Sequence, residues 1–264
     1  MTPPRILIIA GSDSCGGAGI QADIKTVTML GGHAMTAITA ITAQNSLGVE
    51  SVMAVPTEMV LEQIRVVERD IRADAVKIGM IGSAETARAL LPELERYAKR
   101  GIPIVLDPVM VSTSGDALAD EATKAAIEEL IGAAIASLVT PNVGELAALG
   151  GDSVARRLDT VVLAKGGDAP GDIVVDRLLD PSGEIARWSD VRIPTRHTHG
   201  TGCTLASAIA VGLGRGDDLI VSIERARDFV RAALASAPGF GAGCGPVGHA
   251  LGAVPFEAIH RKND

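Results

Sequence analysis

The chain has 264 residues, of which 47% are apolar and only 2% aromatic, and its formal net charge is −8. This composition is typical of a folded globular protein and excludes a disordered chain. The acidic balance argues against a surface for nucleic acid or anionic membranes, so an anionic ligand would need a focused local site.

The three cysteines, Cys15, Cys203 and Cys244, contain no Cys-x-x-Cys pair. This argues against a disulfide framework or a structural zinc site and favours a reducing compartment. No apolar stretch approaches the roughly 20 residues that span a bilayer, and the N-terminal apolar run is too short for a signal peptide. We therefore expect a cytoplasmic protein that binds neither membrane nor nucleic acid, with residues 1–264 forming a single domain.

Short apolar runs alternate with longer amphipathic segments along the chain. Strands are predicted at 6–10, 37–43, 49–55, 75–78, 102–106, 137–139, 160–164, 173–179 and 184–188, and helices at 19–30, 57–72, 83–99, 120–132, 201–213 and 217–235. Thr57 and Ser83 are the expected N-caps of the second and third helices. The alternation predicts an α/β fold of three layers, with a mainly parallel central sheet and helices on both faces.

Ligands of such sheets bind just outside the carboxyl ends of the strands. The residues that follow predicted strands are therefore the first candidates for a site. They are Gly11, Gln44, Gly79, Met80, Asp107, Asn142 and Lys165.

A glycine-rich segment, 11–19, joins the first strand to the first helix. It is not a P-loop, because no Lys-Ser or Lys-Thr follows the glycines. It loosely matches a dinucleotide fingerprint, but its first glycine lies several residues beyond the strand. Three interpretations remain open here: an oxidoreductase, a turn without a ligand, or a loop that lets a flat substrate lie against the backbone.

A second glycine-rich segment, Arg196-His-Thr-His-Gly-Thr-Gly-Cys203, runs into a predicted helix. Gly200 and Gly202 permit conformations that aim successive N–H groups at one point, and the helix start adds about half a positive charge. This pattern predicts an anion site. Cys203 lies in the first helical turn, where a lowered thiol pKa and a role as base are expected. A buried structural cysteine is the alternative, as is a metal pair for His197 and His199.

Acidic groups follow two further strands, at Asp107 and in the segment that contains Asn142 and Glu145. Carboxylates near transferring phosphates hold Mg²⁺, although capping or surface roles are commoner for any one acid. Lys165, in the segment Lys165-Gly-Gly167, would neutralise phosphate charge or be simply solvated.

These segments in this order resemble the ribokinase-like superfamily, and within it the hydroxymethylpyrimidine/phosphomethylpyrimidine kinases of thiamine biosynthesis. The stretches that carry the resemblance cover most of the chain. They are AGSDSCGGAGIQADIKT, ITAITAQNSLGV, KIGMIGS, VLDPVMVSTSGDALAD, VTPNVGEL, KGGD and HTHGTGCTLASAIA.

The resemblance implies ATP-dependent phosphorylation of 4-amino-5-hydroxymethyl-2-methylpyrimidine and then of its monophosphate, with Mg²⁺, in a homodimer. It implies a pyrimidine site, with Gln44 on the amino and ring-nitrogen edge, formed by Gly11, Asp23, Gln44, Met80 and Val109. It implies an anion hole at Gly200, Thr201 and Gly202 beside Cys203, where many superfamily members carry an aspartate base. Asp107, Asn142 and Glu145 would organise Mg²⁺ and phosphate, with Lys165 near the nucleotide phosphates.

The sequence departs from the family in two places. The crossover between Leu149 and Val161 is short, and Asp168 follows Lys-Gly-Gly where histidine is frequent. The resemblance places the crossover towards the nucleotide side, and it places neither change at the proposed chemical centre. A pyridoxal or pyridoxine kinase and a non-catalytic pyrimidine-binding protein remain alternatives.

Overall fold

The computed structural model describes residues 2–110 and 118–254. Segment 111–117, part of one stretch that carries the resemblance, lies outside the described residues. The strands are β1 (Arg5–Asp13), β2 (His33–Gln44), β3 (Val49–Ala54), β4 (Ala75–Ile78), β5 (Ile104–Leu106), β6 (Leu138–Val139), β7 (Val162–Ala164), β8 (Ile173–Asp180) and β9 (Gly183–Val191). The helices are α1 (Gly19–Met29), α2 (Thr57–Asp70), α3 (Ala84–Lys99), α4 (Glu121–Gly132), α5 (Val143–Ala148), the 3₁₀ turn η1 (Gly151–Ser153), α6 (Val154–Arg157), α7 (Thr201–Arg215) and α8 (Leu219–Ala235).

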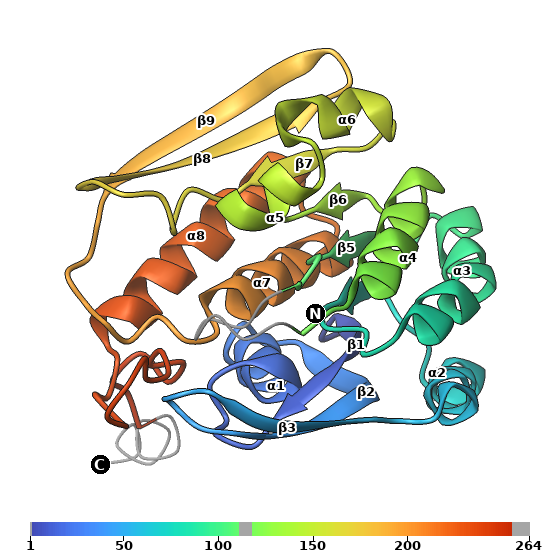
Figure 1. Ribbon diagram of the computed structural model, residues 1–264, viewed down its shortest axis with the longest axis horizontal. Coiled ribbons are helices and arrows are strands. Elements are labelled where there is room, and N and C mark those ends of the chain that lie inside the picture. The colour runs from blue at the N-terminus through green and yellow to red at the C-terminus, as the bar shows by residue number, and fades with distance from the viewer. Residues whose placement is uncertain (1, 111–117, 255–264) are drawn as a thin grey trace.

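In the described residues the strands form one nine-stranded sheet with the order β3-β2-β1-β4-β5-β6-β7-β8-β9 (Figure 1). Neighbouring strands from β2 to β7 run parallel. The two ends of the sheet are antiparallel, where β3 pairs with β2 and the β8–β9 hairpin pairs with β7. The mainly parallel sheet of the sequence prediction is thus confirmed.

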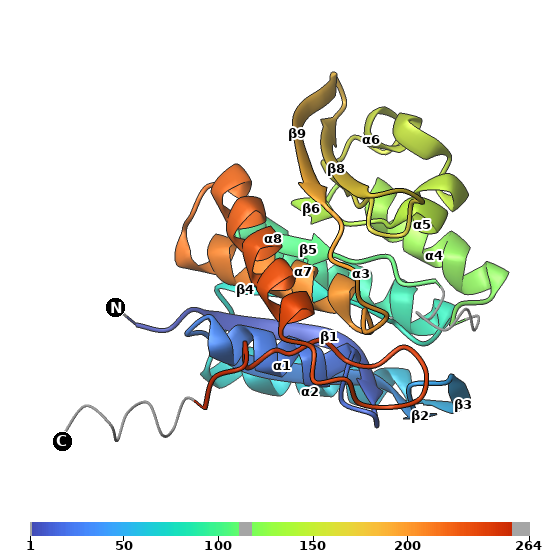
Figure 2. The same cartoon turned by 90° about the vertical axis from the view of Figure 1, so that its left-hand side faces the viewer.

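Helices cover both faces of this sheet (Figure 2). On β1, Leu7 and Ile9 pack with α2 and α3, whereas Ile6 and Ile8 pack with α1, α7 and α8. Because both faces of the strand are covered, the sequence shows a continuous apolar run instead of alternation. Of the described helices, none has both the length and the apolar character that a bilayer crossing needs.

The first strand bends where the site begins. The register between β1 and β2 shifts between Ala10 and Ser12, so Gly11 lies at a bulge. The strand then continues to Asp13, three residues beyond the predicted end at Ala10. This extension carries Asp13 to the carboxyl edge of the sheet, within reach of the second glycine segment.

One local prediction needs correction. Thr57 is the first residue of α2 and not its N-cap, which is Pro56; its hydroxyl instead lies 3.0 Å from the Thr86 hydroxyl. The short crossover after Leu149, to which the sequence analysis assigned no element, contains η1 and α6 over most of its length. Val154 and Ala155 are buried, so the crossover still covers the sheet. The predicted cap of α3 is confirmed, because Ser83 accepts a hydrogen bond from the Thr86 N–H.

Candidate active site

A cavity of about 820 Å³ opens at the carboxyl ends of the parallel strands. Twelve of the thirteen site residues that the resemblance implies line it, and they come from seven separate segments of the chain. They are Gly11, Gln44, Met80, Asp107, Val109, Asn142, Glu145, Lys165, Gly200, Thr201, Gly202 and Cys203. The thirteenth, Asp23, is fully buried and does not line the cavity.

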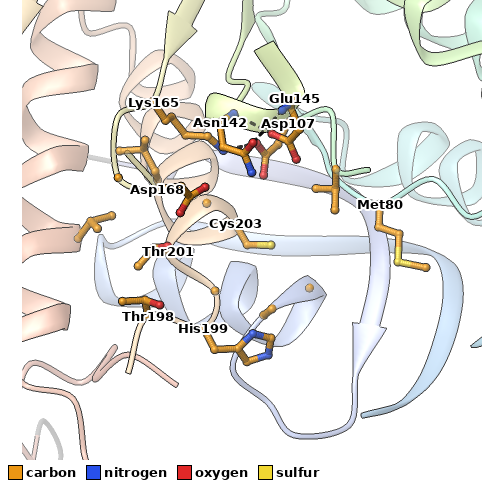
Figure 3. Close-up of a pocket in the computed structure, with 18 of the residues that line it drawn as sticks. Met80, Asp107, Asn142, Glu145, Lys165, Asp168, Thr198, His199, Thr201 and Cys203 are labelled. Atoms are coloured by element: carbon orange, nitrogen blue, oxygen red, sulfur yellow. Dashed lines mark hydrogen bonds and ion pairs between the residues drawn. The ribbon is translucent and has the colours of Figure 1, made fainter. Parts of the chain in front are cut away.

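Acidic groups and a lysine gather on one side of Cys203, with Met80 on another (Figure 3). Lys165 Nζ lies 2.7 Å from Asp107 Oδ1, and the Thr140 hydroxyl donates to the same oxygen over 2.8 Å. Burial lowers the pKa of Lys165, but the negative charges of Asp107 and Glu145 raise it by more. The pKa of Lys165 therefore lies above its usual value. Lys165 is therefore a charged partner of Asp107 with only 12% of its side chain exposed, and not a solvated surface lysine.

The second glycine segment forms the start of α7. Gly200 is the N-cap and has a φ of +88°, which favours glycine. Among the residues that the structure describes, the N–H groups of Gly202 and Cys203 have no hydrogen-bond acceptor. Such free N–H groups are expected in a first helical turn, and here they border the cavity. A phosphate oxygen would satisfy them.

The two glycine segments touch. A Cβ on Gly200 would lie 1.8 Å from the carbonyl oxygen of Gly17. Asp13 Oδ2 accepts from the N–H groups of Gly17 and Ala18 and lies 2.8 Å from His199 Nε2. Asp13 thereby joins the first segment to the residue just before Gly200.

Sequence reasoning missed this role of Asp13 and considered His199 only as a metal ligand. Asp13, Cys15 and His199 do bring potential ligand atoms within 4.8 Å of one another. However, both oxygens of Asp13 already accept hydrogen bonds, including one from the Cys15 N–H. The geometry is that of a hydrogen-bonded clasp. A polar residue at the end of the first strand was the signal that could have indicated it.

The expectation for the Cys203 thiol was wrong in sign. Cys203 lies in the first turn of α7, but burial raises the pKa of its thiol to about 11, against an opposing effect of Lys77. The positive end of the helix does not lower the thiol pKa enough to offset the effect of burial. In the free protein Cys203 is therefore a neutral thiol at pH 7, which faces the cavity.

Asp23 has a different role from the predicted contact with substrate. Its carboxylate pairs with Lys77 through both oxygens at 2.9 Å, and neither side chain is exposed. Ser207 donates to Asp23 over 2.7 Å. Removing one partner of a buried pair costs about 3–5 kcal/mol, because the other charge is left unpaired. Lys77 begins the stretch KIGMIGS, which carries the resemblance, but no role was predicted for it, since it reads as part of a strand.

Glu145 is buried beside Asp107 and closes a capping box with Asn142 at the start of α5. Burial raises the pKa of its carboxyl to about 7, against the opposing effect of Lys165. A cation bound here would favour the ionised form. Carboxylate oxygens of Asp107 and Glu145 are the hard ligands that suit Mg²⁺.

This pKa predicts how stability depends on pH. The native state holds the Glu145 proton up to about pH 7, whereas the usual value is 4.5. Between these values the native state binds more protons than the unfolded state, so this group's contribution to stability falls as pH rises. We expect Glu145→Gln to gain stability relative to the parent protein as pH rises from about 5 to about 8. Urea unfolding at several pH values measures this, and a difference that stays constant with pH contradicts it.

The far end of the cavity is lined by basic and apolar side chains that the sequence did not single out. Arg227 is buried and donates to Asp176 and Asp190, which fixes its guanidinium near this end. Asp168, the residue that departs from the family, also lines the cavity.

Comparison with known proteins identifies a family. Residues 13–248 match the family model described as phosphomethylpyrimidine kinase. The hydroxymethylpyrimidine/phosphomethylpyrimidine kinase of Streptomyces coelicolor is 45% identical, covering 94% of this chain and 95% of its own length. The bifunctional thiamine biosynthesis protein ThiED of Geobacter sulfurreducens is 43% identical, and the match spans 94% of this chain but 52% of that protein.

Solved structures agree with the predicted ribokinase-like fold. The pyridoxal kinase of Staphylococcus aureus in complex with AMP-PCP and pyridoxal has a TM-score of 0.81 at 28% identity, covering 95% of both chains. The phosphomethylpyrimidine kinase of Clostridium difficile has a TM-score of 0.72 at 33% identity, covering 88% of this chain and 99% of that one.

Proposed function

Because this chain belongs to the phosphomethylpyrimidine kinase family, we infer that it transfers the terminal phosphoryl group of ATP to 4-amino-5-hydroxymethyl-2-methylpyrimidine and then to its monophosphate. It is a kinase of thiamine biosynthesis. This leaves no support for the oxidoreductase suggested by the first glycine segment.

One observation carries the chemical proposal. The free N–H groups of Gly202 and Cys203 border a cavity that also holds the Cys203 thiol and the Asp107–Lys165 pair. Phosphoryl transfer depends on positioning and on stabilising charge, with little covalent work for the protein. This site offers backbone donors, a lysine and carboxylates around one point.

We propose that the pyrimidine lies between Met80 and Val109 against Gly11, with Gln44 at its polar edge. Its alcohol oxygen attacks the terminal phosphorus of ATP, the bond from that phosphorus to the bridging oxygen breaks, and ADP leaves. Cys203, as a thiolate, takes the proton of the alcohol. Because the resting group is a thiol, a fraction of the enzyme must first lose this proton.

Mg²⁺ fits the carboxylates of Asp107 and Glu145, and a bound ion would offset the negative charge of the phosphates. Asp107 Oδ1 is used by Lys165 and Thr140, while Oδ2 lies 3.4 Å from the position of a Cβ on Gly202. Asn142 supports Glu145, because the Asn142 N–H donates to Glu145 over 2.8 Å. Lys165 would hold the phosphate that lies over Gly202.

We further propose a homodimer that works in the cytoplasm as one kinase domain spanning residues 1–264. The edge strand β3 and its partner β2 expose Ile41, Val52 and Met53, which is apolar surface suited to a second copy. All three cysteines are free thiols, as expected in a reducing compartment. Sedimentation of the parent protein and of Met53→Asp would test the dimer.

The reaction is tested by coupling ADP release to NADH oxidation, with the pyrimidine alcohol, its monophosphate and pyridoxal as separate substrates. Turnover that requires either pyrimidine supports the proposal, and it eliminates a non-catalytic binding protein. Pyridoxal is included because structural relatives bind it. A higher kcat/KM for pyridoxal than for the pyrimidine alcohol would contradict the proposed substrate.

Gln44 should decide between these substrates. Its side chain lies at the cavity wall, with Oε1 3.3 Å from the Thr42 hydroxyl and Nε2 3.5 Å from His199 Nε2. An unpaired buried polar group costs about 1–3 kcal/mol, so Gln44→Ala should lower kcat/KM for the pyrimidine alcohol by roughly 10- to 100-fold. Activity with pyridoxal, which lacks the aminopyrimidine edge, should fall less. Equal losses for the two substrates would contradict this assignment.

A further inference from the structure

A charged pair lies under the floor of the cavity and has no part in the reaction as described so far. Lys77, on β4, and Asp23, on α1, are both fully buried and are joined by two contacts of 2.9 Å. The Ser207 hydroxyl, on α7, donates to Asp23. The pair therefore connects the sheet to two helices at one point.

This point lies directly beneath the proposed base. Ser207 is four residues after Cys203, so the two side chains share one face of α7. A Cβ on Gly79 would lie 2.8 Å from Lys77 Nζ and 3.2 Å from the side chain of Ala10, which lines the cavity. The ammonium group is thus one layer below the cavity floor.

Four charged side chains from different elements act on the Cys203 thiol. Lys77 lies on β4 and Asp23 on α1, while Asp107 and Lys165 follow β5 and β7. After burial, which raises the pKa of the thiol, Lys77 has the largest effect and lowers it, while Asp23 and Asp107 raise it.

We propose that Lys77 is a positioning residue for the reaction, and that Asp23 holds its ammonium group beneath Cys203 so that the sulfur can carry negative charge during transfer. The inference rests on the proposed function of Cys203. A pair that served stability alone would be no better than well-packed apolar side chains of similar volume. A negative group that forms at the phosphate site above the pair would give the positive charge of Lys77 a use in the reaction.

The test exploits the opposite charges of the pair. Lys77→Met and Asp23→Asn each remove one charge of the same pair and leave the other unpaired, so a purely structural role predicts the same effect for both. Our proposal predicts opposite shifts of the Cys203 thiol pKa: upward by about one unit or more in Lys77→Met, and downward in Asp23→Asn. The pKa is measured from the pH dependence of iodoacetamide alkylation, with Cys203 followed by peptide mass spectrometry.

The alkylation rate follows the thiolate fraction, which changes tenfold for each pKa unit well below the pKa. A thiolate becomes a stronger nucleophile as its pKa rises, which partly offsets its lower fraction. A shift of one pKa unit therefore leaves roughly a threefold net change in the alkylation rate at pH 8. Ser207→Ala is the matched control, because it removes a bond to Asp23 but keeps both charges. It should leave the thiol pKa close to that of the parent protein.

Either single variant can fail to fold, so the double variant Lys77→Met/Asp23→Asn provides a second measurement. It leaves no buried charge unpaired, and the thiol pKa should still rise, because the effect of Lys77 exceeds that of Asp23. An unchanged thiol pKa in the double variant, or shifts of the same sign in both single variants, would overturn the inference.

This test is separate from that of the base itself. If Cys203→Ala keeps full turnover while the thiol pKa shifts as expected, the proposed base fails and the electrostatic effect of Lys77 stands. If Cys203→Ala is inactive and the thiol pKa does not respond to Lys77, the inference about Lys77 fails alone. In variants that fold, kcat/KM at pH 8 should follow the thiol pKa, falling in Lys77→Met.

Discussion

Replacing Cys203 with alanine is expected to lower kcat by about 10²- to 10⁴-fold, the usual contribution of a general base. The KM values for pyrimidine and ATP should change little, because the sulfur is a small part of the cavity wall. The loss would come from the proton that the alcohol must lose as it attacks phosphorus. Steady-state kinetics with the pyrimidine alcohol as substrate measures it.

The pH profile adds an independent readout. Since the pKa of the Cys203 thiol is raised to about 11, the thiolate fraction increases throughout the neutral range. The logarithm of kcat/KM should therefore rise with pH between roughly 7 and 9 in the parent protein, and this rise should vanish in Cys203→Ala. Cys244→Ser, which keeps a polar group beside the Thr198 hydroxyl, is the control and should retain the parent kcat. Full turnover in Cys203→Ala would rule out the assigned base.

Replacing Gly200 with alanine is expected to damage both the fold and the catalytic site. Gly200 has a φ of +88°, and its new Cβ would lie 1.8 Å from the Gly17 carbonyl oxygen. Backbone strain of this kind costs about 1–2 kcal/mol, and the clash adds to it because neither partner is a flexible side chain. The two glycine segments would have to separate, which displaces the N–H groups of Gly202 and Cys203. We expect a loss in kcat of roughly 10²-fold or more, as for removal of a preorganised donor.

Gly216 at the other end of α7 provides the matched control. It also has a positive φ, +91°, but an added Cβ would meet nothing within 4 Å. Gly216→Ala should therefore lose about 1–2 kcal/mol of unfolding free energy through strain alone and keep the parent kcat. Urea unfolding and steady-state kinetics on both variants separate strain from the clash. Equal effects of the two substitutions on kcat would contradict the proposed contact between the glycine segments.

Local signals predicted most helices and strands. Ser83 caps α3 because its hydroxyl can reach the Thr86 N–H, a contact within four residues of sequence. Where the prediction failed, non-local packing was the reason. The Thr57 side chain can cap a helix, but α2 begins at Thr57 itself, one residue too early for Thr57 to be the N-cap. The Thr57 hydroxyl instead pairs with the Thr86 hydroxyl of α3. In the crossover, α6 spans four residues, too few to give a periodic pattern.

In the site, too, local signals predicted some features and non-local packing decided others. Residues directly after parallel strands must share one edge of the sheet, so Asp107 and Lys165 could be brought together from sequence spacing. Asp23 lies in a motif that this chain shares with the kinase family. The motif did not reveal that the Asp23 side chain points into the core and pairs with Lys77. Whether a helical residue faces a cavity or the core depends on what packs against the helix, which a motif does not record.

Apolar periodicity, glycine placement and strand-end chemistry predicted a mainly parallel α/β fold and an anion site at residues 200–203, and the resemblance of the motifs to a kinase family predicted the activity. These properties depend on contacts between near neighbours and on the repeating geometry of strands and helices. The charge state of Cys203, the clasp between Asp13 and His199 and the buried partner of Lys77 depend on segments more than 50 residues apart. Hydration and charge interactions act through space, so these features followed only from the folded chain.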